Sequence, residues 1–214
     1  MKKLTLLLLL SVLYSASYSQ TFHIEAGLSF AKLDMNYRMS GAVKQIYKAP
    51  LLAPTFSTGI EYFQHKNFSI SSDLYYYESG GKFSEEEYGN ENLYTPIHIS
   101  VWYLSYGSAF NFYPLNKKLK LQLSLGPKID YIRTSESAIP YGWIDKSKKI
   151  NKFSVGYTTG IGLYYKLNNR AIGVNMKYFG RMQKLSDVRA SNNDGFDASD
   201  QIFLICLSYK FRFK

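Results

Sequence analysis

The sequence is short of the residues that cross-link a fold or bind metal ions. Its 214 residues contain one cysteine, Cys206, so no disulfide can form within the chain. The only histidines are His23, His65 and His98, and no two of them have a spacing that would bring two imidazoles to one metal ion. Stability must come from packing and hydrogen bonding, and we expect neither a metal nor another cofactor.

The sequence also lacks an apolar run long enough for a membrane-spanning helix. The apolar stretch 4–13 is too short to cross a hydrocarbon core about 30 Å thick. It follows Lys2 and Lys3 and leads into small polar residues, an order that is typical of a secretory signal peptide. We expect residues 1–19 to be removed after export through the Sec pathway, which leaves residues 20–214 as one domain.

Dense basic runs of the kind that bind nucleic acid are missing as well, although the formal net charge is +10. The densest group of lysines, within 146–152, lies in a segment rich in Ser and Asn that has the character of a loop. Since an exported protein does not routinely meet nucleic acid, we exclude it as a partner. The charge instead predicts attraction to outer-membrane lipids and lipopolysaccharide.

Aromatic residues and period-2 patterns are plentiful. Aromatic side chains make up 17% of the chain, and from Phe22 onward apolar residues alternate with polar or small ones. This alternation places successive side chains on opposite faces of a strand. The segments that carry it are 22–30, 56–62, 68–76, 102–112, 119–131, 153–165, 172–178 and 203–213.

The connections between these segments alternate in length. Those at 64–67, 114–118 and 167–170 are short, and the others are long: 36–53, 78–95, 135–151 and 181–199. Short turns on one side and long loops on the other are typical of outer-membrane barrels. We therefore predict an all-β fold: an eight-stranded antiparallel up-and-down transmembrane β-barrel in the cell outer membrane.

One segment departs from simple alternation. Residues 92–116 carry no Lys, Arg, Asp or Glu, but their polar content and alternating order argue against a transmembrane helix. Apolar residues occupy one phase up to Val101 and the other phase from Trp102. We expect a β-bulge between Val101 and Tyr103, or a strand that leaves the membrane there.

The alternation also assigns charged residues to the barrel interior. Isolated charges in a narrow lumen are costly to desolvate, whereas paired charges can be accommodated. We predict that Glu25, Glu61 and Asp73 pair across the lumen with some of Lys128, Lys177, Lys210 and Arg212 and block ion flow. Lys120 and Lys166 are expected near the periplasmic rim. The predicted interior network consists of Glu25, Glu61, Asp73, Lys128, Asp130, Lys177, Lys210 and Arg212.

Several strand motifs resemble those of the PorT-like outer-membrane β-barrel family. They are Leu125-Gly126-Pro127, Gly160-Ile161-Gly162 and the closing segment 207–211. The chain departs from that family at Gly107, where proline is frequent, and at the final Lys214, where an aromatic residue is usual. The resemblance implies an integral outer-membrane barrel that the barrel-assembly machinery inserts, and for most members no established biochemical activity.

Catalytic patterns are sparse. His98 and Ser100 lie two residues apart, like the pair of outer-membrane lipid A deacylases, but the next acidic residue along the chain is Asp130. Because a catalytic imidazole needs a carboxylate to orient it, we expect no enzyme.

The charged segments predicted to be loops are also weak candidates for ligand-binding sites. Three consecutive glutamates at 85–87, with Glu91, diverge too much in direction to favour a Ca²⁺ site over a solvated loop. The lysines of 146–152 are candidates for contact with lipopolysaccharide phosphates. The favoured function is a barrel with a filled interior that is structural or contacts surface components or an unknown surface or periplasmic protein. A lipid hydrolase and a narrow pore or transporter are the alternatives.

Overall fold

The computed structural model describes residues 20–39, 42–46, 49–82, 98–134, 152–182, 186–189 and 195–212. In these ranges the chain forms ten β-strands, and it contains no helix that is long and apolar enough to cross a membrane. The strands are β1 (Thr21–Met39), β2 (Ala42–Ile46), β3 (Ala49–Tyr62), β4 (Phe68–Lys82), β5 (His98–Asn116), β6 (Leu119–Thr134), β7 (Phe153–Leu167), β8 (Arg170–Arg181), β9 (Ser186–Arg189) and β10 (Gly195–Arg212).

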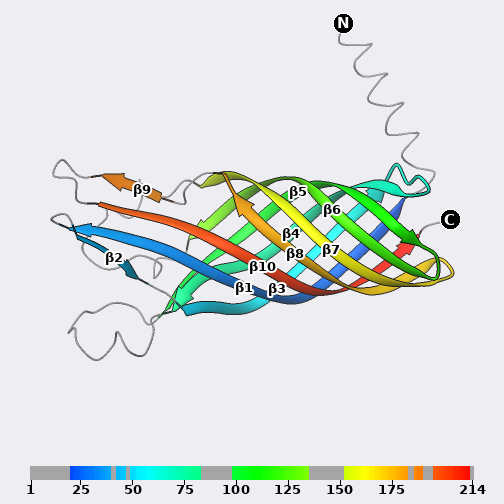
Figure 1. Cartoon of the computed structure of the whole chain (residues 1–214), viewed down its shortest axis with the longest axis horizontal. Helices are drawn as coiled ribbons and strands as arrows, with labels where there is room; N and C mark the ends of the chain where they lie inside the picture. Colours follow the sequence, from blue (N-terminus) through cyan, green and yellow to red (C-terminus); the bar gives the residue numbers. More distant parts are fainter. Residues whose placement is uncertain are drawn as a thin grey trace, which may run out of the picture.

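Eight of these strands close into a barrel, as the sequence predicts. They follow one another in the order β1-β3-β4-β5-β6-β7-β8-β10, each antiparallel to the next, and β10 returns to pair with β1 (Figure 1). The closing register joins Thr21 to Arg212 and continues to Arg38 and Gly195. Closure leaves no free sheet edge within the barrel wall, which a membrane requires.

Short turns gather at one end of the barrel, called the turn end here. The turn between β7 and β8 consists of Asn168 and Asn169, and Asn168 has a φ of 47°. Asparagine tolerates this left-handed conformation, which two-residue hairpin turns use. The opposite, loop end carries the longer connections.

The strands place apolar side chains on the outside and mostly polar ones inside. On β6, Leu123 and Leu125 face outward and are 41% and 62% exposed. Ser124 and Lys128, at the alternate positions of the same strand, face inward and are buried. Leu163 and Ile161 on β7 also face outward. The outside of the barrel is therefore an apolar belt suited to lipid.

Aromatic rings border this belt at both ends. Towards the loop end, Tyr76 stacks on Trp102 with ring centroids 5.0 Å apart. Towards the turn end, the rings of Phe22 and Phe211, on the two strands that close the barrel, lie 5.2 Å apart. Aromatic rings near both ends of an apolar belt are typical of transmembrane barrels.

The bulge expected between Val101 and Tyr103 does not occur. The pairing of β4 with β5 is continuous from Lys82 and His98 to Phe68 and Phe112. Val101 is an apolar residue that faces inward and is buried. The apolar residues therefore change from the inward to the outward positions of β5 at this point, although the strand pairing continues without a bulge. The irregular pairings lie elsewhere, at Pro50/Thr55 and Phe112/Leu115. Within the uncharged segment 92–116, the described residues His98–Asn116 form the strand β5 and not a helix.

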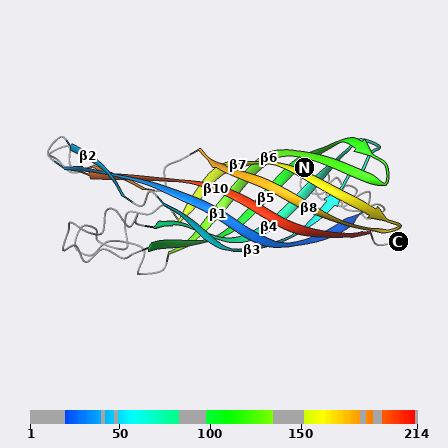
Figure 2. The same ribbon diagram turned by 60° about the horizontal axis from the view of Figure 1, so that its bottom comes forward.

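Two of the predicted loops, 36–53 and 181–199, are partly strands. Beyond the barrel, β1 pairs with β2, and β10 pairs with β9, while β1 and β10 stay paired with each other. The result is a four-stranded sheet β2-β1-β10-β9 that projects from the loop end (Figures 1 and 2). We call this sheet the blade; it comprises residues 35–39, 42–46, 186–189 and 195–198. The loop 135–151, the glutamates of 85–91 and most of the lysines of 146–152 lie outside the described residues.

Candidate functional site: the barrel interior and its mouth

The centre of the lumen is occupied by an ion pair between β1 and β8. The carboxylate of Glu25 accepts hydrogen bonds from Lys177 Nζ at 2.7 Å, Asn175 Nδ2 at 2.9 Å and Ser57 Oγ at 2.8 Å. Lys177 also donates to the Tyr75 hydroxyl at 3.3 Å. All five side chains are buried, so each charge has hydrogen-bonding partners in place of the water it has lost.

A second pair lies beside the first. His23 Nε2 and Asp73 Oδ1 are 2.5 Å apart, and Ser71 donates to the other carboxylate oxygen at 2.9 Å. Gly59 on β3 makes room for this pair, because a Cβ at Gly59 would lie 2.3 Å from Asp73 Oδ1. We call the Glu25 and Asp73 groups together the middle layer.

The layer nearer the turn end is built around Glu61. Its carboxylate accepts from Ser69 Oγ at 2.8 Å and from Lys210 Nζ at 3.4 Å. Lys210 also donates to Gln122 Oε1 at 2.7 Å, and Gln122 donates to Asn111 at 2.8 Å. This turn-side layer therefore links side chains of β3, β4, β5, β6 and β10.

The layer nearer the loop end contains two carboxylates. Asp130 accepts from Lys128 and Ser105, and Arg181 lies 3.8 Å from it. The same arginine pairs with Asp200, with Nη1 and Oδ1 3.1 Å apart, and the Tyr103 hydroxyl donates to Asp200 at 2.8 Å. Buried apolar side chains also line the lumen at and around this loop-side layer: Ala31, Leu51, Ala53, Val101, Ile132 and Ile202.

Little space remains among the middle and turn-side layers. The cavity between them, which Glu25, Asp73, Tyr75 and Lys210 help to line, has a volume of about 10 Å³. That is roughly the space of one water molecule.

The sequence matches the family described as Outer membrane protein beta-barrel domain over residues 16–180. The chain belongs to this family. Its location is therefore the outer membrane, the apolar belt faces lipid, and the turn end is the periplasmic end. No curated protein matches the sequence.

Solved outer-membrane proteins are similar to this structure at low sequence identity. OprG from Pseudomonas aeruginosa is 13% identical with a TM-score of 0.54, and the match covers 90% of this chain and 96% of OprG. Neisserial surface protein A is 13% identical with a TM-score of 0.49, over 90% of this chain and 97% of that protein. Ail, the attachment invasion locus protein of Yersinia pestis, is 14% identical with a TM-score of 0.43, over 90% and 98%.

The structure brings together part of the predicted interior network of this outer-membrane barrel. Glu25 meets Lys177, and Glu61 meets Lys210. These pairs do not cross the full width of the lumen: β8 and β1 are separated only by β10, and β3 and β10 only by β1. Lys128 pairs with Asp130 on its own strand.

Two members of that network are placed differently. Asp73 bonds His23 and not a lysine, because β1 and β4 approach each other across Gly59. Arg212 is exposed at the periplasmic mouth.

Three residues of the interior network were not predicted from the sequence. His23 was expected to be an isolated polar side chain, and Arg181 and Asp200 were expected in or beside a long loop. The signal for the last two was present: alternation continues inward from Lys177 through Phe179 to Arg181, and from Leu204 back to Asp200. Nothing in the sequence pairs His23 with Asp73, which lies fifty residues away.

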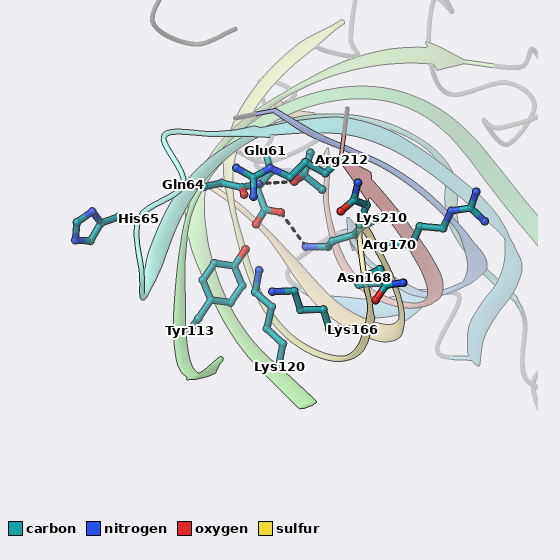
Figure 3. Close-up of a pocket in the computed structure, with 13 residues that line it drawn as sticks. Glu61, Gln64, His65, Tyr113, Lys120, Lys166, Asn168, Arg170, Lys210 and Arg212 are labelled. Atoms are coloured by element: carbon teal, nitrogen blue, oxygen red, sulfur yellow. Dashed lines mark hydrogen bonds and ion pairs between the residues drawn. The ribbon is translucent and has the colours of Figure 1, made fainter. Parts of the chain in front are cut away.

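The periplasmic mouth of the barrel is hollowed. A pocket of about 380 Å³ opens there, below the turn-side layer (Figure 3). Lys120 and Lys166 lie at this mouth, as predicted, and Lys120 Nζ sits 3.5 Å from the centroid of the Tyr113 ring. We call this the mouth pocket.

The predicted catalytic alternative lies on the outer wall. The backbone of His98 pairs with Lys82 at the start of β5, but the side chain of His98 is outside the described residues. Ser100 is half-buried and alternates with the inward Val101, so it faces away from the lumen. In the described part of the chain no group of three or more His, Cys, Asp or Glu side chains is arranged to hold a metal ion.

Proposed function

We propose that this protein is a non-conducting outer-membrane barrel that anchors a surface-contact element, the blade. The observation that carries the first half of the proposal is the closed interior, with a cavity of only about 10 Å³ among its charged layers. A barrel of eight strands has a lumen that side chains can fill, and here they do so with ion pairs and aromatic rings.

The blade supports the second half. A transmembrane β-strand needs about 9 to 11 residues, whereas β1 has 19 and β10 has 18. The surplus continues as paired strand beyond β3 and β8, so it forms a preorganised projection. A rigid sheet on the outer surface costs less ordering entropy on binding than an irregular loop of the same length.

The chemistry of the outer surface favours lipopolysaccharide as the contact. The chain is basic, and the exposed Lys152 directly precedes β7 at the loop end; the other lysines of 146–152 lie outside the described residues. Each lysine near an anionic surface contributes about 1 kcal/mol. During biogenesis the barrel-assembly machinery is the expected partner, with Phe211 and Phe213 near the end of the sequence as its recognition residues; Phe213 lies outside the described residues. The PorT-like resemblance of the strand motifs fits this non-enzymatic role.

A shortened protein tests the proposal. In this variant two tight turns replace residues 36–45 and 187–196, which removes the blade and leaves the eight barrel strands. We expect it to insert and to show the heat-modifiable gel migration of a folded barrel, but to bind lipopolysaccharide and intact cells more weakly than the full chain. Undiminished binding by the folded, shortened protein would contradict a contact role for the blade.

A lipid hydrolase is the second candidate, and the strand register favours it more than the sequence did. Ser100 pairs with Gly80 on β4, and Trp102 pairs with Glu78. Because Ser79 and Val101 face inward, Glu78 and Ser100 share the outward face. A carboxylate is therefore available from the neighbouring strand.

A Ser100→Ala variant in a lipid-hydrolysis assay distinguishes the hydrolase function from the non-conducting anchor function. Ser108→Ala is the matched control, since Ser108 is also half-buried on the outward face of β5. The anchor account predicts no hydrolysis by any of the three proteins. Activity that disappears only in Ser100→Ala would establish the enzyme instead.

A further inference from the structure

The mouth pocket has a charge imbalance that the rest of the interior lacks. In the middle and loop-side layers every carboxylate has a cationic or imidazole partner within ion-pair distance. Among the described residues that line the mouth pocket, Glu61 is the single carboxylate, against five cationic side chains. Those five are Lys120, Lys166, Arg170, Lys210 and Arg212.

Glu61, the single carboxylate, is already engaged in an ion pair with Lys210. It is 1% exposed and accepts from Ser69 and Lys210 on the inner side of the pocket. Lys120 rests on the face of Tyr113, which shields part of it from water, and it has no ion-pair partner among the described residues. Lys120 and Lys166 therefore bring two positive charges to the pocket that no described carboxylate matches at ion-pair distance.

The cationic groups converge from separate strands. Figure 3 shows Lys120, from β6, and Lys166, from β7, extending into the same space below Lys210. Arg170 and Arg212, on β8 and β10, also line the pocket, and Figure 3 shows the Arg170 side chain extending away from the lysines. Holding like charges close together is unfavourable unless an anion lies between them, and the interaction strengthens in a partly desolvated cleft.

We propose that the mouth pocket is a periplasmic binding site for a phosphate-bearing anion with two or more negative charges. Lysine ammonium groups bind phosphate as point charges, and arginine adds a planar fork that can hold two oxygens at once. A ligand with one negative charge would leave one of the two lysines, Lys120 or Lys166, unmatched, which favours a ligand with two or more negative charges. The volume of about 380 Å³ lies in the range of small-ligand sites.

This phosphate chemistry has two sources in the periplasm. One is a soluble diphosphate or phosphorylated metabolite, which would enter the mouth directly. The other is an anionic phospholipid headgroup of the inner leaflet. A groove on the outer wall, lined by Tyr209, Phe211 and the same Arg170 and Arg212, borders the mouth and gives acyl chains an apolar path past the rim.

The test is calorimetric titration of the full-length barrel in phosphatidylcholine nanodiscs at low ionic strength, where charge interactions are least screened. In one arm the titrant is inorganic pyrophosphate, and in the other it is dihexanoyl phosphatidylglycerol below its micelle concentration. We expect saturable binding of at least one titrant. Tighter binding of pyrophosphate assigns the soluble source, and tighter binding of the short-chain lipid assigns the headgroup.

Variants tie the binding to the pocket. Loss of two charge-assisted contacts in Lys120→Ala/Lys166→Ala should weaken binding more than about tenfold. Lys118→Ala is the matched control: Lys118 is two residues from Lys120, but its ammonium lies over the Tyr165 ring and it does not line the pocket. Heat-modifiable gel migration checks that each variant is folded. If the double variant does not fold, the single variant Lys166→Ala, which changes an exposed residue, replaces it in the titration.

Two results would overturn the proposal. One is the absence of saturable binding of both titrants to the wild-type protein. The other is equal affinity of the wild type, the Lys118→Ala control and the pocket variant.

Discussion

Lys177 on β8 bonds Glu25 on β1 at 2.7 Å although β10 lies between their strands. The pair therefore spans the closing seam of the barrel from the inside. It ties β1 to β8 across the last strand, β10, in a region from which water is largely excluded. A buried pair of this kind adds little when intact, but it becomes costly when one partner is removed.

We expect Lys177→Met to destabilise the barrel by about 3 to 5 kcal/mol, because Glu25 would be left as an unpaired buried charge. The measurement is equilibrium urea unfolding in phospholipid vesicles. Glu25→Gln/Lys177→Met should lose less than the single lysine variant, since neither charge remains. Lys118→Met, at an exposed position, is the control and should change stability by less than about 0.5 kcal/mol. A double variant less stable than Lys177→Met would contradict the pairing.

Gly59 should tolerate no side chain. In Gly59→Ala the new methyl group would meet Asp73 Oδ1 at 2.3 Å and His23 Nε2 at 2.7 Å, so the buried pair would have to separate. We expect a loss of about 2 to 3 kcal/mol in the same unfolding assay. Gly107→Ala is the matched control, because there the nearest atom is a Tyr75 ring carbon at 3.2 Å, and it should cost about 1 kcal/mol or less. Equal losses in the two variants would argue against the packing described around His23.

The two faces of β6 should respond oppositely to a lipid-accessibility probe. A spin label at Leu123 should contact lipid, and one at the neighbouring Ser124 should not, because Leu123 faces outward and Ser124 is buried. Leu123→Arg should cost about 2 to 4 kcal/mol if the residue lies near mid-membrane depth. Similar oxygen accessibility at the two labels would mean that the strand is turned or displaced from this register.

Much of this fold could be predicted from the period-2 alternation of apolar residues in the sequence. All eight barrel strands and the three short turns were predicted, because an apolar outward face against lipid must repeat every second residue. The interior gives a weaker pattern. Val101, Ile132 and Ile202 are apolar and inward, so hydrophobicity alone suggested a bulge near Val101 that does not exist.

Strand ends and pairing partners were harder to predict. The blade strands β2 and β9 are only five and four residues long, too short for alternation to stand out from loop sequence. Lys177 could be assigned to the lumen by parity. Its specific partner Glu25, however, depends on the tilt and stagger that closure imposes, and these are properties of the whole barrel.

Single-channel recording in planar bilayers tests the central claim, the closed lumen, most directly. The purified wild-type barrel should show no steady conductance, because its layers of ion pairs leave a cavity of only about 10 Å³ between them. A porin reconstituted in the same bilayers is the positive control, and heat-modifiable migration of the recorded sample shows that the barrel is folded. Steady, porin-sized conductance from the folded wild-type protein would contradict the filled interior and, with it, the assignment of a non-conducting anchor.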